Sequence, residues 1–358
     1  MTWTQQDYQF MSRAMQLARR GQLTCKPNPE VGCVIVRQGD ILNEGWHQFA
    51  GEAHAEINAL NNVNDVANAI VYVTLEPCAH HGLTPPCVDS LIEAKVSEVV
   101  IAMEDPNPLV SGKGIEKLRA AGILVRQGLL KEQAQEINKG FIKRMQVGLP
   151  YVTCKMAMSL DGRTALANGD SQWISSIESR RDVHRIRAMH GAILSSANTV
   201  NYDNAKLSVR DFHGEFIQPV RVIIDRQGKI DKSSVLFSEP GDILIYTQAE
   251  HLTIMHEQTK VIHIHEKKEW LLKVFQHLAV EYQLNNILVE CGADLSSALI
   301  KNKLIDELIV YLAPKILGSD AAALSNITGI QNIDDCYEFI LTETRQFGTD
   351  LRLTYRLH

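Results

Sequence analysis

Short apolar runs and amphipathic stretches alternate along the first 150 residues of the chain. Tyr8, Met11, Met15 and Ala18 are spaced three or four residues apart, which predicts a first helix with one buried face. Further strands are predicted at 31–36, 41–46, 70–75, 99–103 and 123–125, and further helices at 54–60, 114–121 and 132–145. This alternation indicates a layered α/β domain with helices on the faces of a central sheet.

The second half of the chain repeats this kind of pattern after a break at Gly148-Leu149-Pro150. Glycine and proline together end a helix, so we expect a domain boundary here, with domains at 1–148 and 149–358. Strands are predicted at 151–158, 192–195, 220–225, 242–246, 261–265, 286–290 and 307–313, and residues 350–358 alternate like an edge strand. The second domain is therefore also predicted to be α/β.

The composition narrows the possible partners and the compartment. The chain has 358 residues, 45% of them hydrophobic, and its net charge of −6 weighs against a nucleic-acid partner. No basic region followed by an apolar run occurs at the start, and no run of roughly 18 apolar residues predicts a membrane span. We therefore expect a cytoplasmic protein with a small-molecule substrate and neither nucleic-acid nor membrane partners.

The seven cysteines are an odd number at scattered positions, which does not indicate a disulfide framework. A reducing compartment suits thiolates that bind a metal. Two of the cysteines belong to the chemical pattern described next, and the others are interpreted as packing residues: Cys25, Cys33, Cys154, Cys291 and Cys336.

The most informative residues are His54, Glu56, Cys78 and Cys87. One imidazole and two thiolates suit Zn²⁺, and three protein ligands leave a fourth tetrahedral position open to water, which is typical of a catalytic site. Glu56, two residues after the histidine, is placed to move a proton between that water and a departing amine. The pattern therefore predicts a zinc-dependent deaminase of a heterocycle, in which Glu56 is the catalytic residue.

The spacing of the two cysteines is itself distinctive. The common zinc-deaminase pattern is C-x-x-C, whereas eight residues separate Cys78 from Cys87. The stretch 74–87, Thr-Leu-Glu-Pro-Cys-Ala-His-His-Gly-Leu-Thr-Pro-Pro-Cys, together with Asn28-Pro29-Glu30-Val31-Gly32, resembles the deaminase half of the bifunctional riboflavin-biosynthesis deaminase/reductase family, RibD.

The resemblance implies a cytidine-deaminase-like, three-layer α/β/α fold for the first domain. It also implies hydrolytic deamination of 2,5-diamino-6-(5-phosphoribosylamino)pyrimidin-4-one to the corresponding uracil. Asn28 and His47 would then grip the pyrimidine. His80 lies near the metal ligands in sequence.

The second half resembles the reductase half of the same family over several short segments. These are 155–164, 171–174 and 289–292. The resemblance implies a dihydrofolate-reductase-like α/β fold, and reduction by NADPH of the ribosyl group to a ribityl group. Considered without the family resemblance, the segment from Glu290 to Ser296 contains only a strand end, a glycine and a helix start, and this is a weak phosphate-binding pattern.

The resemblance also assigns site residues in this half. Lys155 would be the catalytic residue that orients the reacting ribose, and Arg187 and Arg210 have the planar guanidinium that suits a phosphate. The implied NADPH contacts are Met158, Trp173, Thr199, Asp203, Gly292, Ala293, Asp294, Leu295, Ser296 and Ser297, and the implied substrate contacts are Ser171, Arg187, Leu207, Arg210 and Glu290. We add the hypothesis that Arg226 meets the 2′-phosphate that distinguishes NADPH from NADH.

Three departures from the family pattern stand out. Ala79 replaces a serine, Leu83 replaces a common cation, and Asn204-Ala205-Lys206 replaces an Asp-Pro-like stretch. The lost cation at Leu83 puts one contact with the substrate phosphate in doubt, and the Lys206 change makes the assignment of the reductase loop less secure.

Two alternatives remain open from the sequence. In the first, the zinc site is structural, with Cys33, His80 or His81 as a fourth ligand. In the second, the first domain deaminates another free nucleobase or nucleoside, and the second serves only in binding or oligomerisation. A homo-oligomer is expected in any case.

Overall fold

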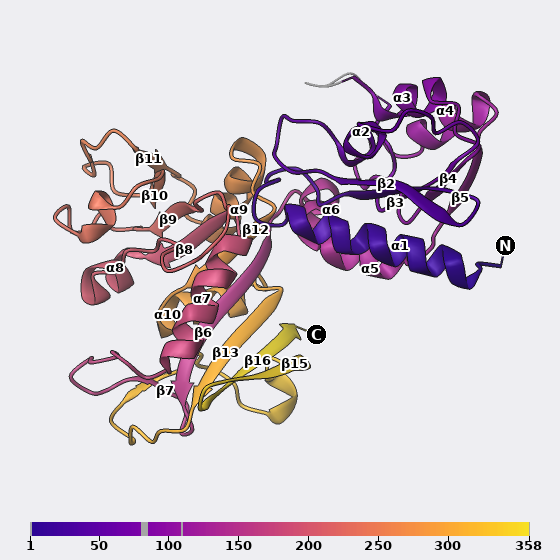
Figure 1. The fold of residues 1–358 in the computed structure, drawn as a ribbon. Coiled ribbons are helices and arrows are strands. Elements are labelled where there is room, and N and C mark those ends of the chain that lie inside the picture. Colours follow the sequence, from indigo (N-terminus) through magenta and orange to yellow (C-terminus); the bar gives the residue numbers. More distant parts are fainter. Residues whose placement is uncertain (1, 80–84, 109, 358) are drawn as a thin grey trace. The chain divides into compact units, whose positions relative to one another are not determined.

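The computed structural model describes residues 2–79, 85–108 and 110–357, and backbone contacts divide it into two compact units, Met1–Leu149 and Pro150–His358 (Figure 1). The division lies one residue after the boundary expected from Gly148-Leu149-Pro150. Gly148, whose φ is 71°, ends the last helix of the first unit in the left-handed conformation that glycine adopts readily. Among the described residues, no helix is long and apolar enough to cross a membrane.

The first unit contains a five-stranded sheet in the order β2-β1-β3-β4-β5. β1 pairs antiparallel with β2 and β3, whereas β3, β4 and β5 are parallel. The strands are β1 (Gly32–Arg37), β2 (Asp40–Trp46), β3 (Ile70–Val73), β4 (Glu98–Ile101) and β5 (Leu124–Gln127).

Helices cover both faces of this sheet, with α1 and α5 on one side and α2, α3 and α4 on the other (Figure 1). They are α1 (Gln5–Ala18), α2 (Ala55–Leu60), α3 (Cys87–Glu93), α4 (Lys113–Ala120), α5 (Lys131–Ile137) and α6 (Lys139–Val147), with a short 3₁₀ turn η1 (Arg19–Gly21). Apolar side chains from the strands and both helix layers form one buried cluster. The predicted three-layer α/β/α domain is confirmed.

The second unit contains a nine-stranded sheet in the order β11-β10-β9-β8-β12-β6-β13-β16-β15. The strands from β11 to β13 are parallel, and β16 and β15 complete the sheet antiparallel. They are β6 (Tyr151–Ser159), β8 (Ala192–Ser196), β9 (Val220–Ile224), β10 (Ile243–Thr247), β11 (Thr259–His263), β12 (Asn286–Glu290), β13 (Glu307–Ala313), β15 (Phe339–Phe347) and β16 (Asp350–Leu357).

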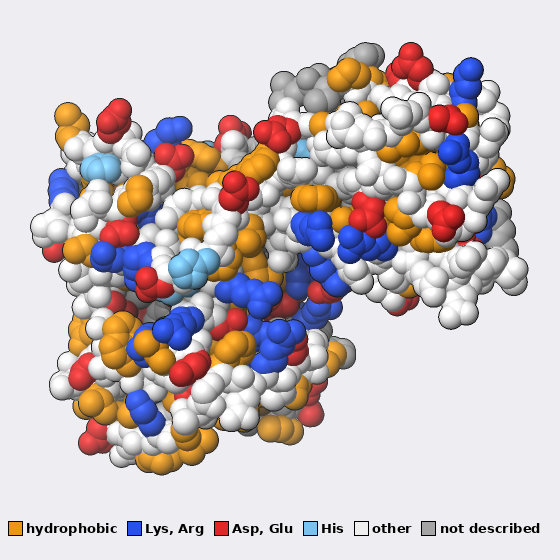
Figure 2. Space-filling model, viewed as in Figure 1, with side chains coloured by type: hydrophobic (Ala, Val, Ile, Leu, Met, Phe, Trp, Pro, Cys, Tyr) orange, Lys and Arg blue, Asp and Glu red, His pale blue; other side chains and the backbone are white. Residues whose placement is uncertain are grey.

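The helices of this unit connect the parallel strands. They are α7 (Ile177–Met189), α8 (Ala197–Asp203), α9 (Trp270–Glu281) and α10 (Ala293–Lys301), with 3₁₀ turns η2 (Val235–Ser238) and η3 (Ile333–Asp335) and a small ladder of β7 (Arg163–Ala165) and β14 (Ala322–Ala323). α7 packs on β12 and β13, and α8 packs on β8 and β9. The face shown in Figure 2 carries acidic and basic side chains interspersed on both units.

Three sequence predictions are wrong in detail. The helix expected at 132–145 is two helices, because Asn138 interrupts it and exchanges two hydrogen bonds with the backbone of Glu30. β16 is not the edge strand, since the largely polar β15 lies outside it. Cys336 is exposed and therefore is not a packing residue.

Candidate functional site

The first unit brings His54, Cys78 and Cys87 together, although they come from three separate elements. His54 precedes the first turn of α2, Cys78 follows β3 by a short loop, and Cys87 begins α3. His54 Nδ1 lies 3.3 Å from Cys87 Sγ and 3.5 Å from Cys78 Sγ. The three ligand atoms are all within 4.8 Å of one another.

This arrangement passes a simple test of fit to zinc. A tetrahedral zinc ion with bonds of about 2.3 Å to sulfur and about 2.1 Å to nitrogen holds such atoms roughly 3.5 Å apart. The amide N–H of Cys87 also donates to Cys78 Sγ at 3.3 Å, which favours the thiolate that a metal requires. The donor set and its spacing therefore suit Zn²⁺.

Close backbone packing against β2 fixes the position of α2, the helix that begins just after His54. A Cβ atom on Gly45 of β2 would lie 2.4 Å from Ala55 O and 2.4 Å from Ala59 N, so only glycine allows α2 to pack this closely on the strand. Asn58 of the same helix donates to Trp46 O at 2.8 Å. The position of His54 is thus set by the contact of α2 with β2.

Glu76 fixes the position of the segment that leads to Cys78. Its carboxylate is 4% exposed and accepts hydrogen bonds from the backbone N–H groups of Asp105, Gly112, Gly114 and Ile115 at 2.9 to 3.3 Å. Several of these donors belong to the first turn of α4, where a carboxylate is stabilised by the helix dipole. Glu76 therefore holds the segment just before Cys78 against the start of α4.

Glu56 lies in the first turn of α2, with its side chain 3% exposed beside the cluster. Burial and the nearby Cys78 raise the pKa of Glu56 to about 7, and the carboxyl group contacts Cys87. The residue proposed from sequence as the proton carrier is thus adjacent to the metal ligands.

Asn28 and His47 form a hydrogen-bonded pair next to this centre. Asn28 Nδ2 lies 3.0 Å from His47 Nε2, and His47 Nδ1 lies 3.2 Å from Ala53 O. Burial lowers the pKa of His47, so the ring is neutral, donates through Nδ1 and accepts from Asn28 through Nε2. The two rings of His47 and His54 meet edge to face at 5.4 Å.

Within the described ranges, the metal-binding group contains only His54, Cys78 and Cys87. Cys33 is fully buried in β1 and is not a member, which weakens one form of the structural-zinc alternative. His80, His81 and Leu83 lie outside the described residues, so the effect of the missing cation at Leu83 stays a prediction.

In the second unit, Lys155, Arg187 and Glu290 form a tight cluster at the centre of the sheet. Lys155 and Glu290 are register partners on β6 and β12, and Lys155 Nζ lies 3.9 Å from Glu290 Oε2. Arg187 of α7 binds both carboxylate oxygens, with Nε–Oε1 at 2.6 Å and Nη2–Oε2 at 3.0 Å. Burial opposes ionisation, but Arg187 and Lys155 lower the pKa of Glu290 to about 2.

Two residues predicted to contact substrate or cofactor meet beside this cluster. Ser171 Oγ donates to Asp203 Oδ1 at 3.4 Å, and burial raises the pKa of Asp203. Trp173 is 61% exposed, with the Arg180 guanidinium 4.4 Å from its ring centre. Met158 is half-buried near the end of β6.

The predicted phosphate-binding residues lie at the carboxyl ends of β8 and β12. Gly292 N donates to Thr199 Oγ1 at 3.3 Å, so the starts of α8 and α10 lie side by side. Ligands of open α/β sheets bind at this edge. Arg226 follows β9 at the same edge and donates to Gln248 Oε1 at 2.6 Å.

The residues predicted to contact NADPH at the start of α10 differ in their solvent exposure. Gly292 and Asp294 are exposed and Ala293 is half-buried, whereas the side chains of Leu295, Ser296 and Ser297 are buried. Ser297 Oγ accepts from Asn326 N at 2.8 Å, and Asp294 Oδ1 accepts from Asn326 Nδ2 at 2.6 Å. Gly292 and Asp294 are therefore the exposed residues at the start of α10, while its serine side chains are engaged internally.

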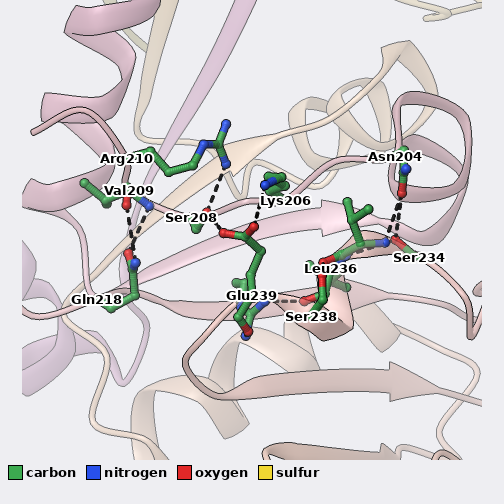
Figure 3. A network of polar contacts seen from close by, with 12 residues as sticks. Asn204, Lys206, Ser208, Val209, Arg210, Gln218, Ser234, Leu236, Ser238 and Glu239 are labelled. Atoms are coloured by element: carbon green, nitrogen blue, oxygen red, sulfur yellow. Dashed lines mark hydrogen bonds and ion pairs between the residues drawn. The ribbon is translucent and has the colours of Figure 1, made fainter.

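Leu207 and Arg210 lie in the loop that follows α8, and Figure 3 shows Arg210 there. Leu207 is 3% exposed and packs in the core, so its side chain faces away from solvent. Arg210 is exposed, and its Nη1 donates to Ser208 Oγ at 3.0 Å. Arg187 Nη1 donates to Ser208 O at 2.9 Å, so both arginines meet at this serine.

Sequence reasoning missed Glu76, Ser208 and Glu239 as residues that organise the sites. Glu76 stands inside the quoted stretch 74–87, where its position two residues before a metal ligand was an available signal. Ser208 and Glu239 carry no sequence signal, because their importance comes from partners distant in the chain.

We predict that Glu76→Gln weakens zinc binding by about tenfold, because an amide NH₂ would replace one acceptor among backbone donors. Zinc affinity of the full-length protein, measured by competition with a chromophoric chelator, checks this. Glu93→Gln, an exposed change on α3, is the matched control and should leave the affinity unchanged. Equal affinities for the two variants would contradict the role given to Glu76.

Each of the two units matches a known protein family. Residues 4–103 match the family model "Cytidine and deoxycytidylate deaminase zinc-binding region", and residues 150–353 match "RibD C-terminal domain". The chain is 45% identical to riboflavin biosynthesis protein RibD of Escherichia coli, covering 97% of this chain and 98% of the relative. It is also 45% identical to RibD of Haemophilus influenzae, covering 99% and 98%.

Solved structures agree over the full length. RibD of Acinetobacter baumannii superposes with a TM-score of 0.92 at 40% identity, covering 99% of each chain. A diaminohydroxyphosphoribosylaminopyrimidine deaminase/5-amino-6-(5-phosphoribosylamino)uracil reductase of Thermotoga maritima superposes with a TM-score of 0.89 at 33% identity, also covering 99% of each.

Proposed function

Because the chain belongs to the RibD family of bifunctional riboflavin-biosynthesis deaminase/reductases, we propose specific substrates for its two units. The first unit deaminates 2,5-diamino-6-(5-phosphoribosylamino)pyrimidin-4-one. The second reduces the ribosyl group of the product to give 5-amino-6-(5-phosphoribitylamino)uracil. The observation that carries the proposal is the convergence of His54, Cys78 and Cys87 beside buried Glu56.

In the deaminase, His54, Cys78 and Cys87 would hold zinc and leave one position open. When bound, zinc supplies Lewis-acid chemistry that makes water nucleophilic near neutral pH. Glu56 would carry the two protons of the attacking water in turn, the first to the ring nitrogen and the second to the departing amine, so that ammonia leaves. Asn28, held by neutral His47, is the residue positioned to bind the pyrimidine.

In the reductase, NADPH supplies the hydride for C1′ of the ribosylamino group. Thr199, Asp203 and the backbone at the start of α10 are the groups that would hold the cofactor. Lys155 presents a cation to the reacting ribose, and Glu290 keeps that cation in place through their close pairing. Arg187 and Arg210 would bind the substrate phosphate, with Ser171 and the backbone of Leu207 close by.

The expected cytoplasmic location and homo-oligomeric state belong to this proposal. The free thiols of Cys78 and Cys87, which a metal must bind as thiolates, favour a reducing compartment. Sedimentation of the purified protein would measure the state of assembly directly.

The proposed function predicts two linked activities on the diaminopyrimidine ribosyl phosphate. Ammonia release should stop when a zinc chelator is added, and NADPH oxidation should then stop because its substrate is no longer made. Direct addition of the deaminated intermediate should restore NADPH oxidation with the chelator present. Ammonia release that survives metal removal would contradict the zinc mechanism, and absent oxidation of added intermediate would contradict the reductase.

Glu56→Gln should keep zinc and lose deaminase turnover by a factor of at least about 10², because it removes the proton carrier and leaves the ligands intact. Zinc content and ammonia release are measured together on the same preparation. The reductase acting on added intermediate is the internal control. Near-normal ammonia release would exclude the proposed role of Glu56.

Arg226→Ala should reduce the preference for NADPH over NADH by about tenfold, because a hydrogen-bonded charge on the 2′-phosphate is lost. The ratio of kcat/KM for the two cofactors measures this directly. Gln248→Ala, which removes the side chain that Arg226 contacts, is the matched variant and should show a smaller effect. An unchanged ratio of kcat/KM for the two cofactors in Arg226→Ala would show that Arg226 does not bind the 2′-phosphate.

A further inference from the structure

The loop at residues 204–210 is held by a second segment, residues 234–239, far away in sequence (Figure 3). Asn204 Oδ1 accepts from Val235 N at 3.1 Å and from Ser234 Oγ at 3.4 Å. Lys206 Nζ lies 2.6 Å from Glu239 Oε1. Two of the three residues that replace the family's Asp-Pro-like stretch, Asn204 and Lys206, thus reach this segment.

Glu239 is the centre of these contacts. Its side chain is 14% exposed, and each oxygen has a partner, since Ser208 Oγ donates to Oε2 at 2.8 Å while Lys206 binds Oε1. Lys206 and Ser208 lower the pKa of Glu239 although burial opposes them, so the group is a carboxylate. One ionised side chain therefore fixes two positions of the loop.

The 234–239 segment is itself anchored to the sheet. Arg221, on β9, is fully buried, and its guanidinium donates to the backbone carbonyls of Leu236, Glu239 and Gly241. A buried guanidinium needs such acceptors, so it holds the segment in one conformation. The position of Glu239 is therefore fixed by the sheet.

Ser208 connects Glu239 to the two arginines, Arg187 and Arg210. The residue is 1% exposed, its carbonyl accepts from Arg187 and its hydroxyl accepts from Arg210. The two guanidiniums therefore converge on one residue, and burial and the neighbouring Arg187 lower the pKa of Arg210. Two guanidiniums beside one residue suit an anionic ligand, and Glu290 already binds one of them, that of Arg187.

The loop needs this outside support because its backbone is unfavourable by itself. Leu207 has φ of 51° and Asn204 has φ of 46°, in the left-handed region, which a leucine rarely adopts. Leu207 is also buried in the core. The far end of the loop has its own contacts, since Val209 N donates to Gln218 Oε1 at 2.9 Å and Arg210 N donates to His184 Nδ1 at 3.1 Å. Glu239 therefore holds the positions at 206 and 208, and through Ser208 the Arg210 side chain.

We propose that Glu239 is a positioning residue of the reductase, which acts through Ser208 and Lys206 to hold Arg210 beside Arg187 for the substrate phosphate. Lys206 supplies, in this chain, an ionic anchor where the family has a stiffer Asp-Pro-like stretch. The proposal rests on the proposed function and assigns residues that the sequence resemblance did not.

The test is the steady-state kinetics of the full-length protein on 5-amino-6-(5-phosphoribosylamino)uracil and on the same compound without its phosphate. Glu239→Gln should raise KM for the phosphorylated substrate by about tenfold, with kcat and KM for NADPH changed less than about twofold. With the dephosphorylated compound, the variant and the unaltered protein should agree. A loss of fold would instead affect both compounds and both parameters.

Glu343→Gln is the matched control, because Glu343 is also an ion-paired carboxylate of the second unit but lies on β15, far from β9 in the strand order. It should leave every reductase parameter unchanged. Lys206→Met alone should raise KM by about threefold and add nothing in the Glu239→Gln background, because the two residues act through one contact. Additive effects would overturn the proposal.

Ser208→Ala provides an independent measurement if Glu239→Gln folds poorly, and it should show the same rise in KM restricted to the phosphorylated substrate. An unchanged KM, or an equal effect on both compounds, would overturn the role of Glu239. Failure of the proposed function gives a different result, because the unaltered protein would then not reduce the substrate. Arg210→Ala raising KM while Glu239→Gln does not would retain the function and reject only this inference.

Discussion

A carboxylate removed from water must find donors for both of its oxygens, and this constraint organises both units of the protein. Glu76 meets it with backbone N–H groups around the start of α4, and so places the segment that leads to Cys78. Glu290 meets it with Arg187 and Lys155. In each case the demand for partners joins segments that are far apart in sequence, and the joined segments carry the chemistry.

The two units use the same geometric principle with different donors. In the first, the starts of α2 and α3 and the loop after β3 supply a histidine and two thiolates to one point. In the second, the carboxyl ends of β8, β9 and β12 gather Thr199, Arg226 and Gly292 along one edge of a parallel sheet. Parallel strands bring their ends to the same side, which makes such an edge a general place for ligands.

The sequence predicted most strands and helices within a few residues, because apolar periodicity reflects which face of an element is buried. It failed where a single tertiary contact decided the outcome. Asn138 divides a helical stretch because its side chain bonds the backbone of Glu30, over one hundred residues away in the chain. β15 was missed because its apolar run covers only residues 339–341 and the rest of this exposed strand is mostly polar, and β16 was therefore taken for the edge.

The sequence by itself determined the candidate donor set His54, Cys78 and Cys87, the choice of Glu56 as the proposed proton carrier, and the two-domain α/β organisation, because residue chemistry and periodicity are local properties. Only the tertiary structure decided the sheet order, the burial of the Leu207 and Ser297 side chains, and the anchoring of the 204–210 loop by Glu239. These three features depend on which segments, distant in sequence, supply hydrogen-bond partners to each other's buried charges and backbone groups. A linear pattern contains no record of that pairing.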